Sequence, residues 1–252
     1  MEAHLYEEMA RVEEHHWWFR GRRAVILAVM QQHLKPRPGR RILDVGCGTG
    51  GNLAVLRQFG QVEGLDHSEE ALRFCRERLG PDFPLHRGAL PEGLPPGRFD
   101  VVTAFDVLEH LSDPVGTLRA IHQALEPDGT LVCAVPAFPF LWSSHDEVHH
   151  HQRRYTLSLL RQQLTEAGLR VRWSSYFNSL LFPPIAAVRL LQRLGPKQQA
   201  TRSDVETGGP AWANRLLETV FSAERFVVPR FSLPAGVSLM ALASPEDGGP
   251  AA

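Results

Sequence analysis

The feature that most constrains the fold is an alternation of short apolar runs with amphipathic segments, which begins near residue 40. The runs RILDV, QVEGLD, PLHRG, FDVVTAF and TLVCAV are typical of buried strands, and residues 51–59, 68–79 and 113–125 have the apolar spacing of helices. Strands that alternate with helices form right-handed βαβ crossovers. The sequence therefore predicts an α/β fold with a mainly parallel sheet covered on both faces.

The remaining segments extend this pattern at both ends. Residues 1–35 are expected to be helical, residues 157–167 form a further helix, and RVRWSSY is a sixth strand. A helix is predicted around 211–226, and GVSLMALAS near the end is a seventh strand that enters the sheet by a hairpin-like return. We expect a single domain divided into an N-terminal helical lid (1–38), a core (39–175), a helical insertion (176–235) and a final strand with its tail (236–252).

Composition and charge exclude several classes of function. The chain has 252 residues, 43% hydrophobic content and a formal net charge of −1, with basic residues spread along its length, so we expect no nucleic-acid partner. Three widely spaced cysteines do not suggest a disulfide framework, and the acidic N-terminus lacks the pattern of a signal peptide. These features predict a cytoplasmic protein. The sequence carries no signal for the oligomeric state.

The most apolar stretch lies at residues 176–195. Pro183 and Pro184 interrupt it, and it contains Arg189 and Arg193, which argues against a transmembrane segment. A core or lid helix is one interpretation. The other is contact with an apolar acceptor molecule or peripheral contact with a membrane.

A glycine turn follows the first predicted strand, in RILDVGCGTGGNL. Such a turn directs backbone N–H groups and a helix N-terminus at a ligand, and Gly46, Gly48 and Gly51 match the G-x-G-x-x-G pattern of dinucleotide sites. Asp44 argues against a pyrophosphate, because its carboxylate would repel a ligand of like charge. It would instead favour an ammonium or sulfonium group, and S-adenosylmethionine carries both.

A second acid, Asp66, ends the second predicted strand. A carboxylate at this position can accept both hydroxyls of a ribose. The alternative is a structural role at the start of the next helix, although Ser68 is already well suited to cap that helix.

Together, LDVGCGTGGNL, GLDHS, FDVVTAFDVLEHLSDP and the closing strand resemble the class I S-adenosylmethionine-dependent methyltransferases. The resemblance implies a Rossmann-like seven-stranded sheet of order 3-2-1-4-5-7-6 whose last strand is antiparallel. It also implies cofactor contacts along the sheet edge: the methionine part at Gly46, Cys47 and Gly48, the ribose at Asp66, the adenine edge at His67, and the amino-acid moiety at Phe105 and Asp106. Many relatives have Gly-Asp after the third strand. This chain has Gly88, Ala89 and Leu90, so adenine would be held by backbone groups and apolar contact at Ala89 and Leu90.

The N-terminal segment EEHHWWFRGRR is similar to the lid of a bacterial subgroup of these enzymes, whose other signatures resemble HDE, RRYT and YFN here. The resemblance implies that Trp17, Trp18 and Phe19 close over the cofactor and that Arg20 or Arg23 binds its carboxylate. The alternative is that the aromatic residues dock the N-terminal helix on the core.

Histidines are concentrated where the chemistry would take place. His110 follows the fourth strand and HDEVHHHQRRY follows the fifth, and ligands of such sheets bind at the carboxyl ends of the strands. A methyl acceptor loses a proton, and a histidine is suited to take it. Candidate catalytic residues are His110, His145, Asp146 and Tyr155. A metal trio of His145, His149 and Asp146, or a solvated loop, remain alternatives, and we assign no metal ligand.

The sequence thus predicts a methyltransferase that uses S-adenosylmethionine, yields S-adenosylhomocysteine, and methylates an oxygen or a nitrogen of a small-molecule acceptor, with an apolar acceptor as one option. The alternatives are an NAD-dependent oxidoreductase and a cofactor-binding protein without turnover. Binding of S-adenosylhomocysteine rather than NAD would separate the first two.

Overall fold

The computed structural model describes residues 3–194 and 210–246. The chain forms two compact units, each built from three separate segments. The unit called here the helical unit comprises Met1–Lys35, Pro136–Thr156 and Ser175–Leu239, and the sheet unit comprises Pro36–Val135, Leu157–Ser174 and Met240–Ala252.

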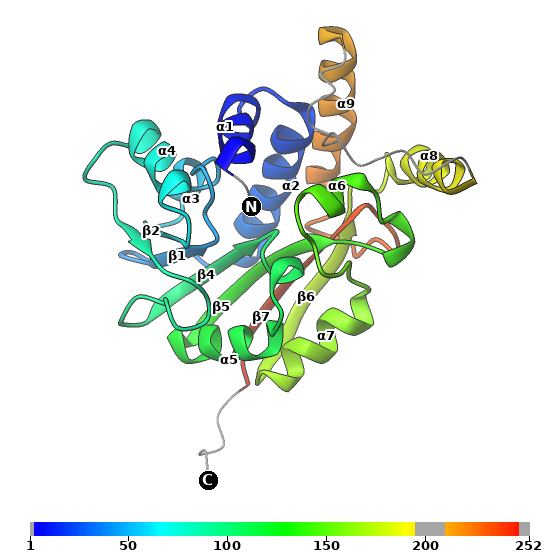
Figure 1. The fold of residues 1–252 in the computed structure, drawn as a ribbon. Helices are drawn as coiled ribbons and strands as arrows, with labels where there is room; N and C mark the ends of the chain where they lie inside the picture. The colour runs from blue at the N-terminus through cyan, green and yellow to red at the C-terminus, as the bar shows by residue number, and fades with distance from the viewer. Residues whose placement is uncertain (1–2, 195–209, 247–252) are drawn as a thin grey trace. The chain divides into compact units, whose positions relative to one another are not determined.

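A seven-stranded mixed sheet has the strand order β3-β2-β1-β4-β5-β7-β6, and Figure 1 shows its strands in sequence colours. Its strands are β1 (Arg41–Val45), β2 (Gln61–Asp66), β3 (Leu85–Arg87), β4 (Phe99–Phe105), β5 (Leu125–Pro136), β6 (Leu169–Phe177) and β7 (Ser238–Pro245). The predicted order, with the closing strand antiparallel, is confirmed. Within the parallel part, Asp44 of β1 lies in register with Gly64 of β2 and Thr103 of β4. This register aligns the carboxyl ends of β1, β2 and β4.

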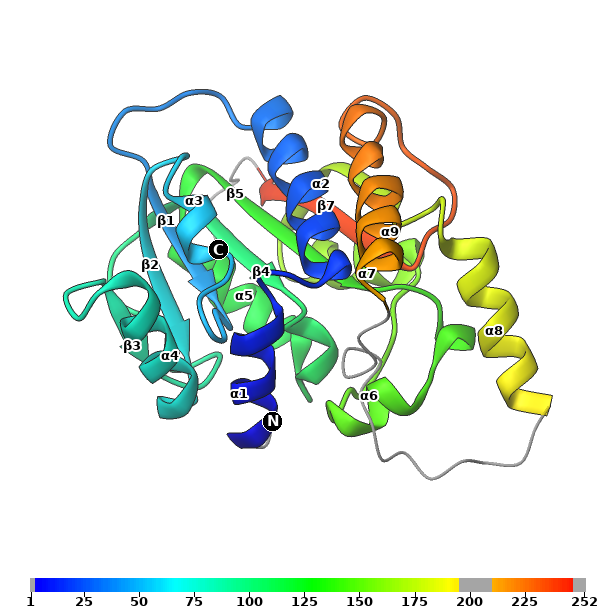
Figure 2. The same cartoon turned by 90° about the horizontal axis from the view of Figure 1, so that it is seen from above.

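In the described part of the sheet unit, the faces of the sheet are covered by the helices α3 (Leu53–Leu56), α4 (Glu69–Leu79), α5 (Pro114–Ala124) and α7 (Leu157–Glu166). In Figures 1 and 2, α3 and α4 lie on one face and α5 and α7 on the other. The predicted helix at 51–59 was too long, because only four residues are helical. Asn52 makes no side-chain cap, and the chain turns again where Phe59 N–H donates to Leu56 O at 2.9 Å.

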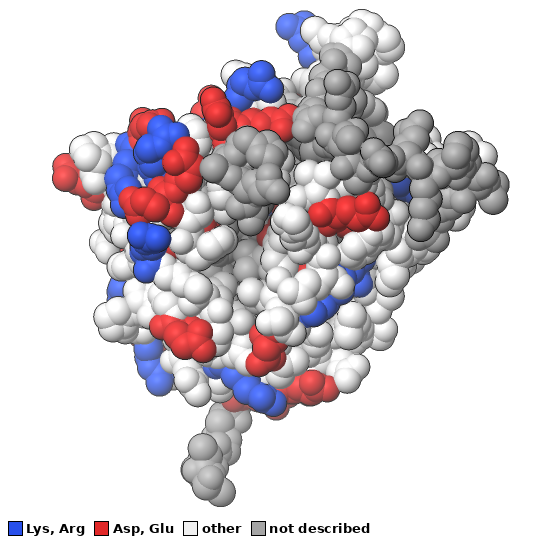
Figure 3. All heavy atoms as spheres, viewed as in Figure 1, with Lys and Arg blue, Asp and Glu red and all other residues white. Residues whose placement is uncertain are grey.

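The start of α4 follows the predicted capping. Ser68 Oγ accepts from Ala71 N–H at 3.3 Å, and Glu69 and Glu70 lie in the first turn, where acidic side chains complement the helix dipole. Arg73 pairs with Glu70 and Glu77 on the exposed surface of the helix. Figure 3 accordingly shows acidic and basic side chains intermingled over α4.

The helical unit contains α1 (Ala3–Val12), α2 (Trp17–His33), α6 (Ser144–Val148), α8 (Phe182–Leu194) and α9 (Ala211–Ala223), with short 3-10 helices η2 (Pro139–Leu141) and η3 (Glu224–Phe226). Helices α2 and α9 lie side by side in both ribbon views. Their packing requires Gly21, because a Cβ there would come within 2.6 Å of Phe221 Cδ1. Trp17 N–H donates to Asn214 Oδ1 at 2.9 Å across the same pair. Within the described residues, no helix combines the length and apolarity needed to cross a membrane.

Candidate functional site

The glycine turn after β1 has backbone conformations that favour glycine. Gly46, Gly48 and Gly50 have φ values of 66°, 55° and 85°, in the left-handed region. A Cβ at Gly46 would also lie 2.5 Å from Val107 Cγ2. The turn is therefore restricted to glycine by conformation and, at Gly46, by space, as expected of a backbone cradle that a ligand approaches closely.

Asp66, at the end of β2, organises this cradle. Its side chain is 6% exposed, Oδ2 accepts from Gly48 N–H at 2.9 Å, and Oδ1 accepts from Ser68 N–H at 2.9 Å. The carboxylate thus joins the glycine turn to the cap of α4 through backbone donors. A carboxylate has about four lone-pair sites, so these two bonds leave acceptor capacity for a ligand. His67 Nδ1 lies 3.3 Å from Asp66 Oδ1, on a side chain that is largely exposed.

Two more predicted cofactor residues lie close to this turn along the strands. Asp44 is buried in β1, and its Oδ1 accepts from Thr103 Oγ1 of β4 at 2.5 Å. Asp106, just after β4, has φ 56°, and its N–H donates to Ala134 O at 2.9 Å, while neighbouring Phe105 is buried. A left-handed aspartate at a strand end is uncommon and is typical of functional sites.

The loop after β3 is hydrogen-bonded to the end of β2. Gly88 N–H donates to Asp66 O at 3.0 Å, and Gly93 N–H donates back to Ala89 O at 2.6 Å. Ala89 and Leu90 are therefore the two residues that follow Gly88, whose N–H is bonded to the Asp66 backbone. This position is compatible with the apolar adenine contact implied by the sequence, which stays a prediction.

Cys47 lies inside the glycine turn and serves packing. Its N–H donates to Leu65 O at 3.0 Å, and Cys75 Sγ donates to Gly48 O at 3.1 Å. A side-chain hydrogen bond between the Cys47 and Cys75 thiols, together with burial, raises the pKa of the Cys47 thiol. The thiol therefore stays protonated at neutral pH and is a poor nucleophile.

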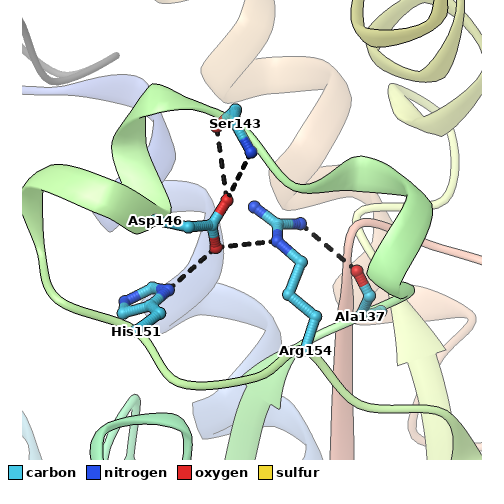
Figure 4. A network of polar contacts seen from close by, with 5 residues as sticks. All are labelled: Ala137, Ser143, Asp146, His151 and Arg154. Atoms are coloured by element: carbon cyan, nitrogen blue, oxygen red, sulfur yellow. Dashed lines mark hydrogen bonds and ion pairs between the residues drawn. The ribbon is translucent and has the colours of Figure 1, made fainter. Parts of the chain in front are cut away.

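In the helical unit, the histidine-rich segment is built around Asp146. Ser143 and Asp146 form a capping box at the start of α6, with Ser143 N–H donating to Asp146 Oδ2 at 2.8 Å. Oδ1 lies 2.8 Å from His151 Nδ1 and accepts from Arg154 Nε at 2.8 Å, and Arg154 also donates to Ala137 O at 3.2 Å (Figure 4). Although burial opposes ionisation, the bonds from His151 and Arg154 lower the pKa of the Asp146 carboxyl.

Three imidazoles gather beside this network. The ring of His145 lies 4.2 Å from that of His149 and 5.9 Å from that of His151, between centroids. Burial and the neighbouring imidazoles lower the pKa of His145 well below 6.5 and that of His149 to about 4. Both rings are therefore neutral near pH 7.

The other predicted catalytic residues have different settings. His110 ends the 3-10 helix η1 (Leu108–His110) of the sheet unit, where its N–H donates to Val107 O at 3.0 Å. It is half-buried, whereas its neighbour Glu109 is fully buried. Tyr155 is fully buried in the helical unit, and its backbone pairs with Pro136 and Phe138.

The N-terminal signature residues have partners within the helical unit. Arg20 Nε pairs with Glu218 Oε1 of α9 at 2.9 Å, and Arg23 donates to Glu13 O at 2.5 Å. The Arg22 guanidinium lies 5.1 Å from the centre of the Trp18 ring. These contacts match the docking interpretation of the segment. The cofactor contacts proposed for Trp18, Arg20 and Arg23 stay predictions.

Sequence reasoning missed the role of Glu224. Its carboxylate is 2% exposed, and Oε1 accepts from Ser179 N–H at 2.6 Å and Leu180 N–H at 2.8 Å, which fixes the turn before α8. Adjacent Asn178 is fully buried with φ 56°, and among the described residues its side-chain amide has no hydrogen-bond partner. The motif YFN marked Asn178, but no local pattern connects it to Glu224, 46 residues later.

Comparison with known proteins identifies the relatives. A family model described as a methyltransferase domain matches residues 16–173. A ubiquinone biosynthesis O-methyltransferase of Albidiferax ferrireducens is 40% identical over 106 residues, which span 38% of this chain and 41% of the relative. A protein of the same name from Xanthomonas campestris pv. campestris is 38% identical over 101 residues, covering 37% and 42%. The chain thus matches about two fifths of the length of these relatives.

Solved structures share the fold. The methyltransferase in a complex with the Haloferax volcanii Trm112 activator has a TM-score of 0.59 and 21% identity, covering 96% of this chain and 98% of that one. An S-adenosylmethionine-dependent methyltransferase from Mesorhizobium loti has a TM-score of 0.56 and 19% identity, covering 85% and 95%. At this level of identity the likeness concerns the fold alone.

Proposed function

We propose, from the premise that this chain belongs to the methyltransferase-domain family and takes S-adenosylmethionine as its cofactor, that it methylates an oxygen atom of a small-molecule acceptor. The preference for oxygen is supported by relatives named as O-methyltransferases. The family match also disfavours the alternative of an NAD-dependent oxidoreductase.

The observation that carries the proposal is the cradle formed by the glycine turn and Asp66. Left-handed glycines free the backbone to approach a ligand, and Asp66 keeps acceptor capacity while bonded to Gly48 and Ser68. These residues fit a nucleoside with a cationic amino-acid tail, because Asp66 can accept the hydroxyls of a ribose and the carboxylate of Asp44 would oppose a pyrophosphate. When bound, the cofactor supplies a methyl group on a sulfonium for in-line transfer to the acceptor.

Proton removal from the acceptor is assigned to a histidine, with His110 and His145 as the two candidates. A base should be unprotonated at the working pH, which the lowered pKa of His145 ensures, but a pKa well below that pH also makes the imidazole a weaker base. Asp146 is proposed as a positioning residue, because it is fully buried and binds His151 and Arg154 within the same segment.

An apolar acceptor is supported by an aromatic cluster in the helical unit. The Phe138 ring stacks on Tyr176 at 4.8 Å between centroids, with Phe140 at 5.3 Å and Phe182 at 5.6 Å. The three phenylalanines are half-buried. Phe138 has φ 55°, a strained conformation for a bulky residue, which marks this position as a functional candidate.

Two measurements test the proposal. S-adenosylhomocysteine should raise the melting temperature of the protein while NAD leaves it unchanged, and stabilisation by NAD alone would overturn the assignment. The methyl-transfer rate is then measured with phenols and with matched anilines, and a rate confined to anilines would contradict an oxygen acceptor.

The base is tested with His110→Gln and His145→Gln, and exposed His15→Gln is the control. The variant that lacks the base should lose about 100-fold or more in kcat while keeping its affinity for S-adenosylhomocysteine. Unchanged kcat in both variants would exclude a histidine base at these positions.

A further inference from the structure

Helix α8 is an apolar helix that the described residues of its unit leave largely exposed. Its sequence, FPPIAAVRLLQRL, is mostly apolar, yet none of the side chains described in the helix is buried. Leu191 is 67% exposed, and Val188 and Leu190 are also largely exposed, as is Leu180 just before the helix. In Figures 1 and 2, α8 extends away from α2 and α9 of the same unit. Contiguous exposed apolar surface of this kind usually marks an interaction site.

The helix is nevertheless held firmly at its N-terminal end. Glu224 accepts the N–H groups of Ser179 and Leu180, and Ser179 Oγ donates to Ala235 O at 2.5 Å. Phe182, the first residue of α8, packs 5.6 Å from Phe138 between ring centroids. These contacts attach the N-terminal end of α8 to the rest of the helical unit, and the exposed apolar residues lie further along the same helix.

The charge of the helix indicates the chemistry of its partner. Two arginines, Arg189 and Arg193, occur in α8, and its sequence contains no acidic residue. Apolar residues combined with arginine are typical of helices that lie in the interface of an anionic membrane.

The length of α8 agrees with a helix that lies on a membrane. Its 13 residues extend about 20 Å, which is shorter than the roughly 30 Å hydrocarbon core of a bilayer.

We infer that α8 docks this protein on an anionic phospholipid membrane, with Val188, Leu190 and Leu191 in the lipid interface and Arg189 at the headgroups. This surface is independent of the proposed methyl transfer. It can be measured without cofactor or acceptor.

The experiment is co-sedimentation of the full-length protein with phosphatidylglycerol-rich vesicles and with pure phosphatidylcholine vesicles. We expect binding to the anionic vesicles that weakens as salt is added, and much weaker binding to the neutral ones. Leu191→Glu should reduce the partition coefficient at least about tenfold, the order expected for burial of one leucine. Arg189→Gln should reduce it about fivefold.

Phe231→Glu is the matched control, because Phe231 is 63% exposed in the same unit but lies outside α8. It should bind vesicles as the wild type does. Unchanged melting temperatures verify that the variants are folded, and Arg189→Gln tests the inference even if Leu191→Glu folds poorly.

Three results would overturn the inference: no sedimentation with anionic vesicles, equal binding to both lipids, or equal loss in Phe231→Glu. A concentration-dependent dimer in light scattering that Leu191→Glu abolishes, without vesicle binding by the wild type, would assign the surface to a second copy instead.

Discussion

Asp66 and Asp146 are both buried carboxylates in segments for which the sequence predicts a function, but their surroundings differ. Asp66 accepts two backbone N–H groups, from Gly48 and Ser68, and its basic neighbour is the largely exposed imidazole of His67, at 3.3 Å. Asp146 accepts from the Ser143 backbone and binds two basic side chains, those of His151 and Arg154. The first carboxylate keeps acceptor capacity, whereas the charge of the second is largely balanced by Arg154 and His151.

This difference supports the proposed roles, ligand binding for Asp66 and positioning for Asp146. A carboxylate held by neutral backbone donors can still accept the hydroxyls of a ligand. A carboxylate that already binds an arginine and a histidine stabilises its own segment, and its removal leaves a buried cation without a partner. The type of neighbour, rather than burial, therefore indicates which aspartate is available to a ligand.

The largest effect is expected for Asp146→Asn. Loss of the charge leaves buried Arg154 uncompensated, so the free energy of unfolding should fall by about 3–5 kcal/mol, measured by urea denaturation. Glu147→Gln, at the exposed neighbouring position in α6, is the control and should change the free energy by less than about 0.5 kcal/mol. A neutral result for Asp146→Asn would mean that the ion pair contributes no net stability.

Asp66→Asn should reduce the affinity for the cofactor more than it reduces the free energy of unfolding, the reverse of what is expected for Asp146→Asn. Loss of a charged acceptor should weaken binding of S-adenosylhomocysteine about 10- to 100-fold by calorimetry. Exposed Glu69→Gln in α4 should bind as the wild type does. The comparison between the two aspartates breaks down if Asp66→Asn is destabilised as much as Asp146→Asn but keeps its affinity.

Gly46→Ala tests the cradle itself. The added Cβ meets Val107 and the residue has φ 66°, so we expect about a tenfold loss of affinity for S-adenosylhomocysteine and a lower melting temperature. Gly39→Ala is the matched control, because Gly39 has φ 69° but nothing within 4 Å of an added Cβ. If both substitutions reduced the affinity and the melting temperature equally, the loss would be due to backbone conformation alone and not to the contact with Val107.

The smallest effect is a pH dependence that originates beside Asp146. The pKa of His149 is about 4 in the folded protein against 6.5 for an unperturbed histidine, so the unfolded chain binds more protons between these values. Stability is fully present above pH 6.5 and is lost as pH falls toward 4, by about 1–2 kcal/mol between pH 7 and 5. The pKa of His145 is also lowered, so its ring contributes to the pH dependence with the same sign.

Urea denaturation at pH 7, 6 and 5 measures this dependence. His149→Asn should flatten it, and exposed His15→Asn should leave it unchanged. A wild-type protein equally stable at pH 5 and pH 7 would contradict the lowered pKa of the two half-buried imidazoles.

The sheet unit was largely predictable because its signals are local. The strand runs, the glycine turn and the Ser68 cap each lie within a few residues of one another, and the sheet order followed from the resemblance. The helix at 51–59 was the main error. Its apolar spacing was helical, but the chain turns soon after Leu56, which periodicity does not show.

The helical unit could be recognised only in pieces. The aromatic segment, the histidine-rich segment and YFN were each noted, but their partners come from distant parts of the chain. Trp17 binds Asn214, 197 residues away, and Glu224 binds the backbone before α8. No spacing rule predicts such pairs, because they depend on how α2 and α9 pack.

By itself the sequence determined the strand and helix periods, the glycine turn and its acids, since backbone conformation and short-range hydrogen bonds set these features. Tertiary structure decided which charges are neutralised and which apolar residues stay exposed. The charge of Asp146 is balanced because Arg154 and His151 fold against it, and the apolar residues of α8 are exposed because the described part of its own unit does not cover them. Charge and burial depend on neighbours in space, and a single chain position does not specify them.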